Sequence, residues 1–251
     1  VIGFTSRNFD GSDPKYLNNS DCDIFHKSDV LFGIDTARKE IARTQMAYLV
    51  EGAPDCMRLQ SIGVTNTVAC LGSEWNGSHF NQLNKVATAV CFIPDSDVIK
   101  PDQRLPHGIE AVIKAGMKAI EHGLTVFVRE IPADGKKQDA DSYFHNKEDF
   151  NNIPKQDFIL WLSEKLFSTS QTIDDKTTSL NRIASVLSAL NDSTKTDFYI
   201  AQLKKYTDGQ KKTWKDALKQ RTGDKKATSR CALTMTNTTD SKDFGFIIRN
   251  N

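Results

Sequence analysis

Acidic side chains directly follow two short apolar segments near the middle of the chain. Residues 47–50 lead into Glu51, and residues 88–93 are followed by Asp95 and Asp97. Short apolar segments that stop at an acid are typical of buried parallel strands, whose carboxyl ends meet at one edge of a sheet. Three carboxylates at one edge repel one another unless a divalent cation lies among them, and such oxygen ligands suit Mg²⁺ or Mn²⁺. The pattern predicts a metal site at this edge.

The segments around these acids alternate between strand-like and helical patterns. Strand-like apolar segments occur at 47–50, 67–71, 88–93 and 126–128. Helical spacing of apolar residues occurs at 35–43, 55–61, 78–86 and 108–122. This alternation predicts an α/β fold in which helices cover a central parallel sheet. A second pair of spaced acids, Asp139 and Asp141, comes shortly after the fourth strand, and we expect it at the same edge.

The two ends of the chain show other patterns. The first part holds short strand-like segments between turns, which predicts a small N-terminal α+β subdomain. After about residue 153, apolar residues recur at helical spacing with no strand-like segments between them, which predicts a C-terminal helical subdomain. The expected divisions are an α+β lead-in subdomain at 1–45, the α/β domain at 46–150, the helical subdomain at 151–222, and a tail or linker to a further domain at 223–251.

Composition excludes several classes of protein. The formal net charge of the 251 residues is +1, so the chain as a whole is not a polybasic nucleic-acid binder. Five cysteines without Cys-x-x-Cys spacing argue against a zinc ribbon and against a disulfide framework, so we expect no zinc and a reducing, cytoplasmic setting. No signal peptide and no membrane-spanning segment are evident. The five histidines have no metal-binding spacing, and we expect them at the surface.

Seven short motifs follow one another along the first 150 residues. They are Gly3-to-Arg7, Lys15-Tyr16-Leu17-Asn18, Phe25-His26-Lys27, Glu51-Gly52, Leu71-Gly72-Ser73, Asp95-Ser96-Asp97 and Asp139-Ala140-Asp141. In this order and spacing they resemble the toprim-containing RNA-polymerase catalytic core of bacterial DnaG-type DNA primases. Two departures, Ser73 in place of threonine and Val98 where that family has Ala-Gly, indicate a divergent member of the kind carried by a phage, plasmid or other mobile element.

The resemblance implies a toprim fold and a metal-dependent enzyme that makes short RNA primers on a single-stranded DNA template from ribonucleoside triphosphates. It implies Mg²⁺ or Mn²⁺ as cofactor and a replicative helicase as partner. The implied catalytic residues are Glu51, Asp95 and Asp97, and Glu51 is either a metal ligand or the base for the attacking hydroxyl. Asp139 and Asp141 join these three as implied metal ligands.

Four residues of the lead-in subdomain are implied to bind nucleotide or DNA, namely Arg7, Lys15, Asn18 and Lys27. From spacing alone, solvated surface charges are the favoured interpretation of the three cations, and Asn18 could equally cap a turn.

Two other functions remain compatible with the acids. One is a different toprim enzyme, a nuclease or topoisomerase-like protein that cleaves DNA strands, although the lead-in motifs resemble those of primases specifically. The other is a degenerate toprim module that binds DNA or a helicase without chemistry, which the missing Ala-Gly favours.

Overall fold

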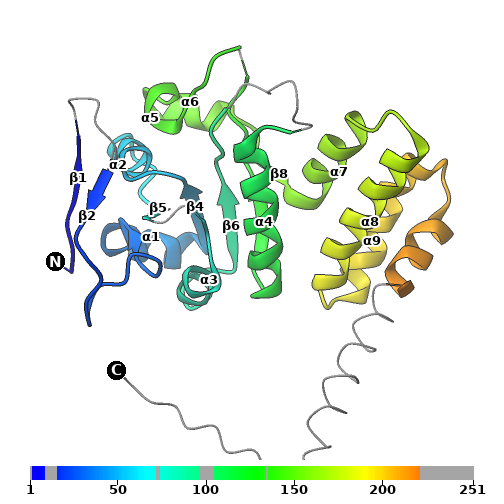
Figure 1. Cartoon of the computed structure of the whole chain (residues 1–251), viewed down its shortest axis with the longest axis horizontal. Coiled ribbons are helices and arrows are strands. Elements are labelled where there is room, and N and C mark those ends of the chain that lie inside the picture. The colour runs from blue at the N-terminus through cyan, green and yellow to red at the C-terminus, as the bar shows by residue number, and fades with distance from the viewer. Residues whose placement is uncertain (1, 9–15, 72–73, 97–104, 134, 221–251) are drawn as a thin grey trace, which may run out of the picture.

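The centre of the molecule is a six-stranded sheet with the strand order β3-β5-β4-β6-β7-β8 (Figure 1). The computed structural model describes residues 2–8, 16–71, 74–96, 105–133 and 135–220. The four inner strands run parallel, namely β5 (Thr67–Cys70), β4 (Met46–Val50), β6 (Ala89–Phe92) and β7 (Thr125–Val128). This confirms the predicted parallel sheet. Two short edge strands pair antiparallel, namely β3 (Leu31–Phe32) and β8 (Gln156–Asp157). Of these, β3 lies in the lead-in region of expected short strands, and β8 was not predicted.

Helices cover both faces of this sheet. Successive residues of a strand point to opposite faces, so Leu49 packs in one apolar cluster and Val50 in the other. The cluster of Leu49 includes residues of α1 (Ile34–Thr44), α3 (Gly77–Leu83) and α4 (His107–Glu121). The cluster of Val50 includes residues of α2 (Ala53–Ser61), α5 (Ala140–Tyr143) and α6 (Lys147–Asn152). The result is the three-layered α/β arrangement that the alternating pattern predicts.

A two-stranded antiparallel sheet precedes this domain. It consists of β1 (Thr5–Arg7) and β2 (Tyr16–Asn18), with Arg7 opposite Tyr16. The turn that follows is held to α3, because the side chains of Asn76 and Gln82 donate hydrogen bonds to the backbone oxygens of Ser28 (2.6 Å) and Asp29 (2.7 Å). Since β3 then joins the main sheet, the lead-in region is attached to the α/β domain by backbone pairing as well as by side chains.

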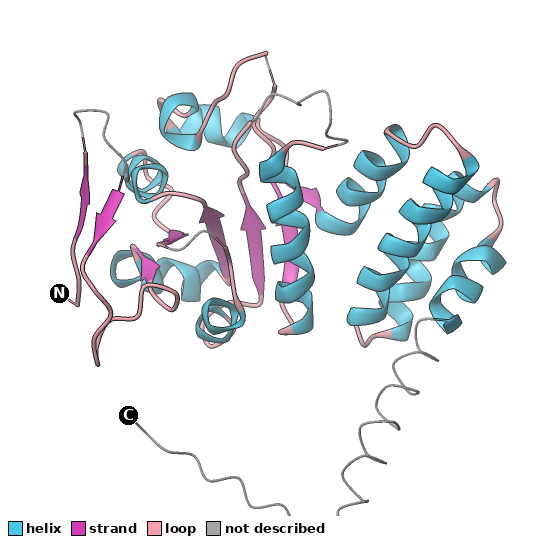
Figure 2. Cartoon of the chain, in the orientation of Figure 1, coloured by secondary structure: helices cyan, strands magenta, loops and turns pink. Residues whose placement is uncertain are grey.

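The chain ends its described part in helices beside β7 (Figure 2). They are α7 (Phe158–Ser168), α8 (Ile173–Ala189), α9 (Ser193–Leu203) and the short 3₁₀ helix η1 (Lys204–Thr207), and residues 211–220 are also helical. Gly116 of α4 lies against the ring of Phe158, where an added Cβ would be only 2.5 Å from ring carbons. The helical subdomain is therefore packed closely onto the sheet domain. In the described parts, no helix combines the length and the apolar character that a membrane span requires.

Candidate metal and active site

Glu51 and Asp95 lie at the carboxyl ends of two neighbouring parallel strands. Leu49 of β4 pairs with Phe92 of β6, and the N–H of Ile93 donates to the oxygen of Leu49 (2.9 Å). The chain then continues to Glu51 on one strand and to Asp95 on the other, so both acids come to the same edge. The side chain of Asp95 is only 13% exposed. Burial, and then the negative charge of Glu51, raise the pKa of Asp95 from 3.8 to about 8.

A backbone bridge brings the second acidic motif to this place. The N–H of Ser96 donates to the oxygen of Gln138 (2.7 Å), and the N–H of Gln138 donates back to Ser96 (3.0 Å). Asp139, the next residue, is the N-cap of α5, and its Oδ1 accepts hydrogen bonds from the backbone N–H (2.9 Å) and hydroxyl (2.6 Å) of Ser142. Asp139 is close enough for its charge to contribute to the raised pKa of Asp95.

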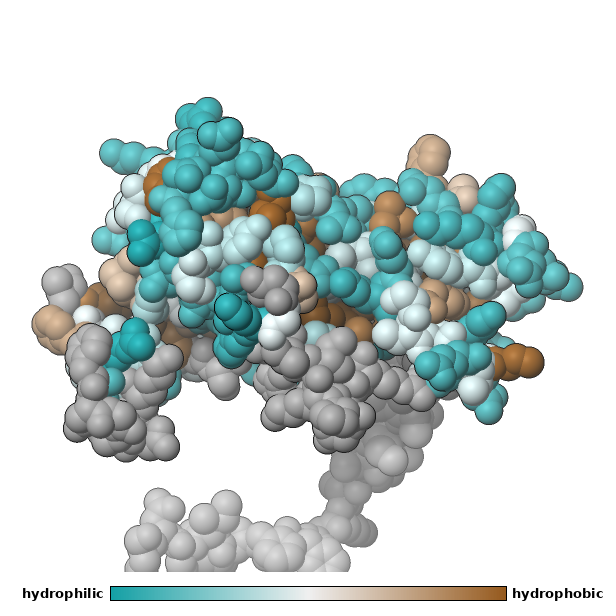
Figure 3. All heavy atoms as spheres, turned by 90° about the horizontal axis from the view of Figure 1, so that it is seen from above, coloured by the Kyte–Doolittle hydropathy of each residue, from teal (hydrophilic) through white to brown (hydrophobic). Residues whose placement is uncertain are grey.

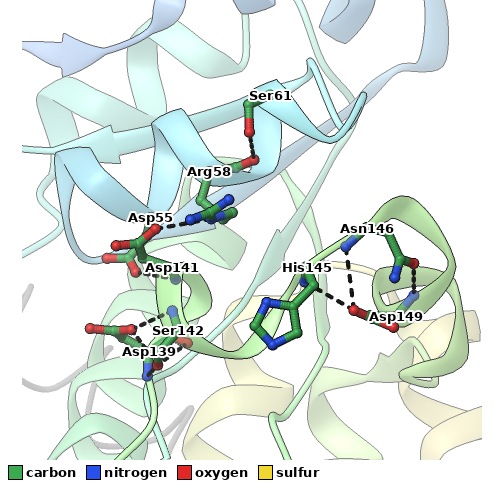
Figure 4. A network of polar contacts seen from close by, with 9 residues as sticks. All are labelled: Asp55, Arg58, Ser61, Asp139, Asp141, Ser142, His145, Asn146 and Asp149. Atoms are coloured by element: carbon green, nitrogen blue, oxygen red, sulfur yellow. Dashed lines mark hydrogen bonds and ion pairs between the residues drawn. The ribbon is translucent and has the colours of Figure 1, made fainter.

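Asp55 is a further acid beside Glu51, Asp95 and Asp139, which together form an acidic cluster at this edge. The sequence analysis missed Asp55. It is the third residue of α2 and only 6% exposed. Its Oδ2 accepts a hydrogen bond from the N–H of Gly52 (3.1 Å). Its Oδ1 accepts one from the N–H of Asp141 (3.0 Å), and Figure 4 shows these two residues side by side. Burial raises the pKa of Asp55, and the charges of Asp139 and Asp141 add to the effect. Its sequence signal is its place at the start of the helical segment 55–61, four residues after Glu51.

Asp141 faces α2. Its Oδ1 lies 3.0 Å from Nε of Arg58, one turn along that helix from Asp55. Figure 4 shows Asp55, Arg58 and Asp141 together between α2 and α5. The acids whose charges raise the pKa of Asp95 are Glu51, Asp55 and Asp139.

The described acids form a charged cluster without a completed coordination shell. In the ranges that the structure covers, no three His, Cys, Asp or Glu side chains are arranged to hold a metal ion as they stand. Asp97 falls outside the described residues. The ammonium group of Lys137 lies nearby, with its Nζ 3.9 Å from Oδ2 of Asp95, but the side chain of Lys137 is 66% exposed. That contact neutralises Asp95 only weakly.

The lead-in residues lie on a different part of the molecule. Arg7 is exposed on β1 with its guanidinium 5.7 Å from the ring centroid of Tyr16, and Asn18 is half-buried on β2. In an antiparallel pair, residues 5, 7, 16 and 18 share one face, so Arg7 and Asn18 lie on the same side of the hairpin. Lys27 is exposed in the following turn. Lys15 falls outside the described residues.

A pocket of about 390 Å³ opens beside Glu51. It lies between the carboxyl ends of β4 and β6 and the helix α4, and Trp75 and Phe92 form part of its apolar wall. Lys114 and Lys118 line it from α4. Its volume is in the range of small-molecule sites. Figure 3 shows the molecule from the side toward which the arrowheads of β4 and β6 point, and hydrophilic residues cover most of the described surface there.

The parallel sheet with acids at its carboxyl edge is that of a toprim-like protein, and residues 48–144 match the family model described as Toprim-like. Residues 1–38 match the model described as DNA primase catalytic core, N-terminal domain. The chain belongs to the DnaG-type DNA primase catalytic cores with a toprim domain.

Individual relatives agree with this assignment. The DNA primase of Staphylococcus aureus is 30% identical over 159 residues, which cover 62% of this chain and 24% of that protein. The structure of the E. coli primase catalytic core has 25% identity and a TM-score of 0.68, and the match covers 82% of this chain and 65% of that one. A structure of the DnaG primase catalytic domain bound to single-stranded DNA has 26% identity, a TM-score of 0.68, and coverage of 82% and 64%. The chain spans about a quarter of the length of the curated relative.

Proposed function

We propose that this chain is the part of a DNA primase that catalyses nucleotidyl transfer, the template-directed synthesis of short RNA primers on single-stranded DNA. The observation that carries the proposal is the buried carboxyl group of Asp95, whose pKa is raised to about 8 by burial and by neighbouring acids at the carboxyl edge of a toprim-like sheet. Such a concentration of negative charge is what a divalent metal ion stabilises.

The proposed metal ligands are the acids at this edge. They are Glu51, Asp95, Asp97, Asp139 and Asp141. Carboxylate oxygens are the donors that Mg²⁺ and Mn²⁺ prefer, and the charge on the cluster fits such ions. When bound, divalent ions stabilise the attacking and leaving oxygens of an in-line displacement at phosphorus.

The protein groups have separate tasks in this reaction. Asp55 fixes the backbone on either side of the cluster through its bonds to Gly52 and Asp141. Glu51 either ligates metal or accepts the proton of the attacking 3′-hydroxyl, for which it must come within hydrogen-bond reach of that hydroxyl. Of the proposed ligands that the structure describes, Glu51 is exposed and Asp95, Asp139 and Asp141 are half-buried, which leaves them accessible to a polyphosphate.

Template and ribonucleoside triphosphates are proposed to contact the lead-in residues Arg7, Lys15, Asn18 and Lys27. Cationic side chains bind phosphate oxygens irrespective of sequence, and an amide can hydrogen-bond to a sugar or base. The similar DnaG catalytic domain bound to single-stranded DNA supports this partner. A replicative helicase as protein partner rests on the family resemblance alone.

The test is primer synthesis by the purified chain with single-stranded DNA, four ribonucleoside triphosphates and Mn²⁺ or Mg²⁺. We expect Glu51→Gln and Asp95→Asn each to reduce synthesis by at least about 100-fold, the order of effect of removing a group that acts on the transition state. The matched control is Glu121→Gln, an exposed acid in the last turn of α4, which should leave synthesis unchanged. Normal synthesis by Glu51→Gln or Asp95→Asn would contradict the proposal. Incubation with labelled DNA alone tests the nuclease alternative, which cleavage without nucleotides would favour.

A further inference from the structure

The helix α2 contacts Asp141 in two ways. Asp55 accepts a hydrogen bond from the backbone N–H of Asp141, and Arg58 forms an ion pair with its carboxylate. Asp55 and Arg58 are three residues apart on α2 and so lie on the same face of the helix. The backbone of Asp141 is thereby anchored by a buried group, while its side chain is held by a half-exposed one (Figure 4).

We propose that Arg58 competes with the divalent cation for the carboxylate of Asp141 and so weakens metal binding at this end of the acidic cluster. The inference rests on the proposed function, because it assumes that the cluster binds metal. Arg58 is a positioning residue in this scheme, since it acts on the site through Asp141.

Electrostatics determines the sign of the effect. The guanidinium of Arg58 is a positive charge next to Oδ1 of Asp141. A metal ion bound by that oxygen would have to displace Arg58 or lie close to a like charge. The pair is 40% exposed on the Arg58 side and 44% on the Asp141 side. Exposed pairs of this kind are weak, so displacement is possible and the effect on metal affinity should be moderate.

A purely structural ion pair would behave differently. If Arg58 served only to orient Asp141, its removal would leave metal affinity unchanged or would lower it. If Arg58 acted only through the general field of a positive charge, its removal would tighten metal binding whether or not Asp141 carries a charge. Competition alone requires both tighter binding and dependence on Asp141.

The experiment measures Mn²⁺ binding by the loss of the electron paramagnetic resonance signal of the free ion, without nucleotide. Arg58→Ala should tighten Mn²⁺ binding by about three- to tenfold, as expected for removal of one nearby charge in a solvated site. Arg58→Lys keeps the charge and should bind within about twofold of the wild-type chain. Arg43→Ala is the remote control, because Arg43 forms an exposed pair with Glu40 (2.6 Å) on α1.

A double-mutant cycle with Asp141→Asn completes the test. In the Asp141→Asn background, Arg58→Ala should change Mn²⁺ affinity little, because the contested carboxylate is gone. The proposal is overturned if Arg58→Ala leaves affinity unchanged or lowers it while the wild-type chain binds Mn²⁺, or if its full effect persists with Asp141→Asn. Absence of Mn²⁺ binding by both the wild-type chain and Arg58→Ala would instead refute the metal site of the proposed function, and this inference with it.

Discussion

The carboxylate of Asp55 accepts a hydrogen bond from the backbone N–H of Asp141, a residue 86 positions later in the chain. The same carboxylate accepts the N–H of Gly52, which directly follows Glu51. One buried side chain therefore joins the loop after β4 to the first turn of α5. These are the two segments that carry Glu51 and the pair Asp139 and Asp141, so Asp55 determines how far apart these acids lie.

Asp55→Ala tests this role. The substitution leaves the N–H groups of Gly52 and Asp141 without their acceptor in a buried place, so we expect a loss of about 1–2 kcal/mol in the free energy of unfolding, measured with urea. Because the spacing of the acids is then no longer fixed, primer synthesis should fall by about tenfold or more. The control is Asp149→Ala, which removes a similar cap from α6, where Asp149 accepts the N–H groups of His145 and Asn146. It should lose stability but retain synthesis, and equal activity in both variants would contradict the role of Asp55.

Asp95→Asn should stabilise the fold while it abolishes activity. The pKa of Asp95 is about 8 in the folded chain against 3.8 ordinarily, so the folded state holds the proton more tightly than the unfolded state does. The contribution of the Asp95 carboxyl group to the free energy of unfolding is fully present below about pH 4 and is lost as the pH rises through 8. In chelator, we expect the melting temperature of the wild-type chain to fall across this window more steeply than that of Asp95→Asn. A lower melting temperature for Asp95→Asn than for the wild-type chain at pH 8 would contradict the raised pKa of Asp95.

Arg129 should matter for stability more than its position after β7 suggests. Its Nη1 donates to the backbone oxygens of Phe150 (3.0 Å) and Ile153, and its guanidinium lies 4.6 Å from the ring centroid of Phe150. Arg129→Ala leaves those oxygens without a donor and removes the contact with the ring, so we expect a loss of about 2–3 kcal/mol in urea unfolding. Arg43→Ala, whose partner Glu40 is on the same exposed helix surface, should change stability little. Equal losses of unfolding free energy in Arg129→Ala and Arg43→Ala would contradict a stabilising role for the contacts of Arg129.

The inner strands and their helices could be predicted because their sequence signals are local. Apolar segments at 47–50 and 88–93 gave the central strands, and the acids after them fixed the edge at which Glu51 and Asp95 meet. The edge strands β3 and β8 have only two residues each, which is too short for a periodic signal. They exist because the main sheet offers unpaired backbone groups at both edges.

Residues whose role depends on distant contacts could not be predicted. Asp55 has the sequence context of an ordinary acid in the first turn of a helix, and only the fold brings it to Asp141. His79 was expected at the surface but is fully buried in α3, where its Nδ1 accepts the N–H of Asn76. A histidine beside a helix N-terminus gives no sequence signal of burial, because burial here follows from packing against Trp75, whose ring centroid is 5.4 Å away.

The most direct test of the metal site is anomalous diffraction from crystals of the chain soaked in Mn²⁺. We expect an anomalous peak at the carboxyl edge of the sheet, about 2.1 Å from carboxylate oxygens of both Glu51 and Asp95, the distance typical of Mg²⁺ bound to oxygen. The same crystals of Asp95→Asn should show the peak weakened or lost. Ordered, unprotonated carboxylates with no anomalous density between them at saturating Mn²⁺ would contradict the proposal that these acids bind the catalytic metal.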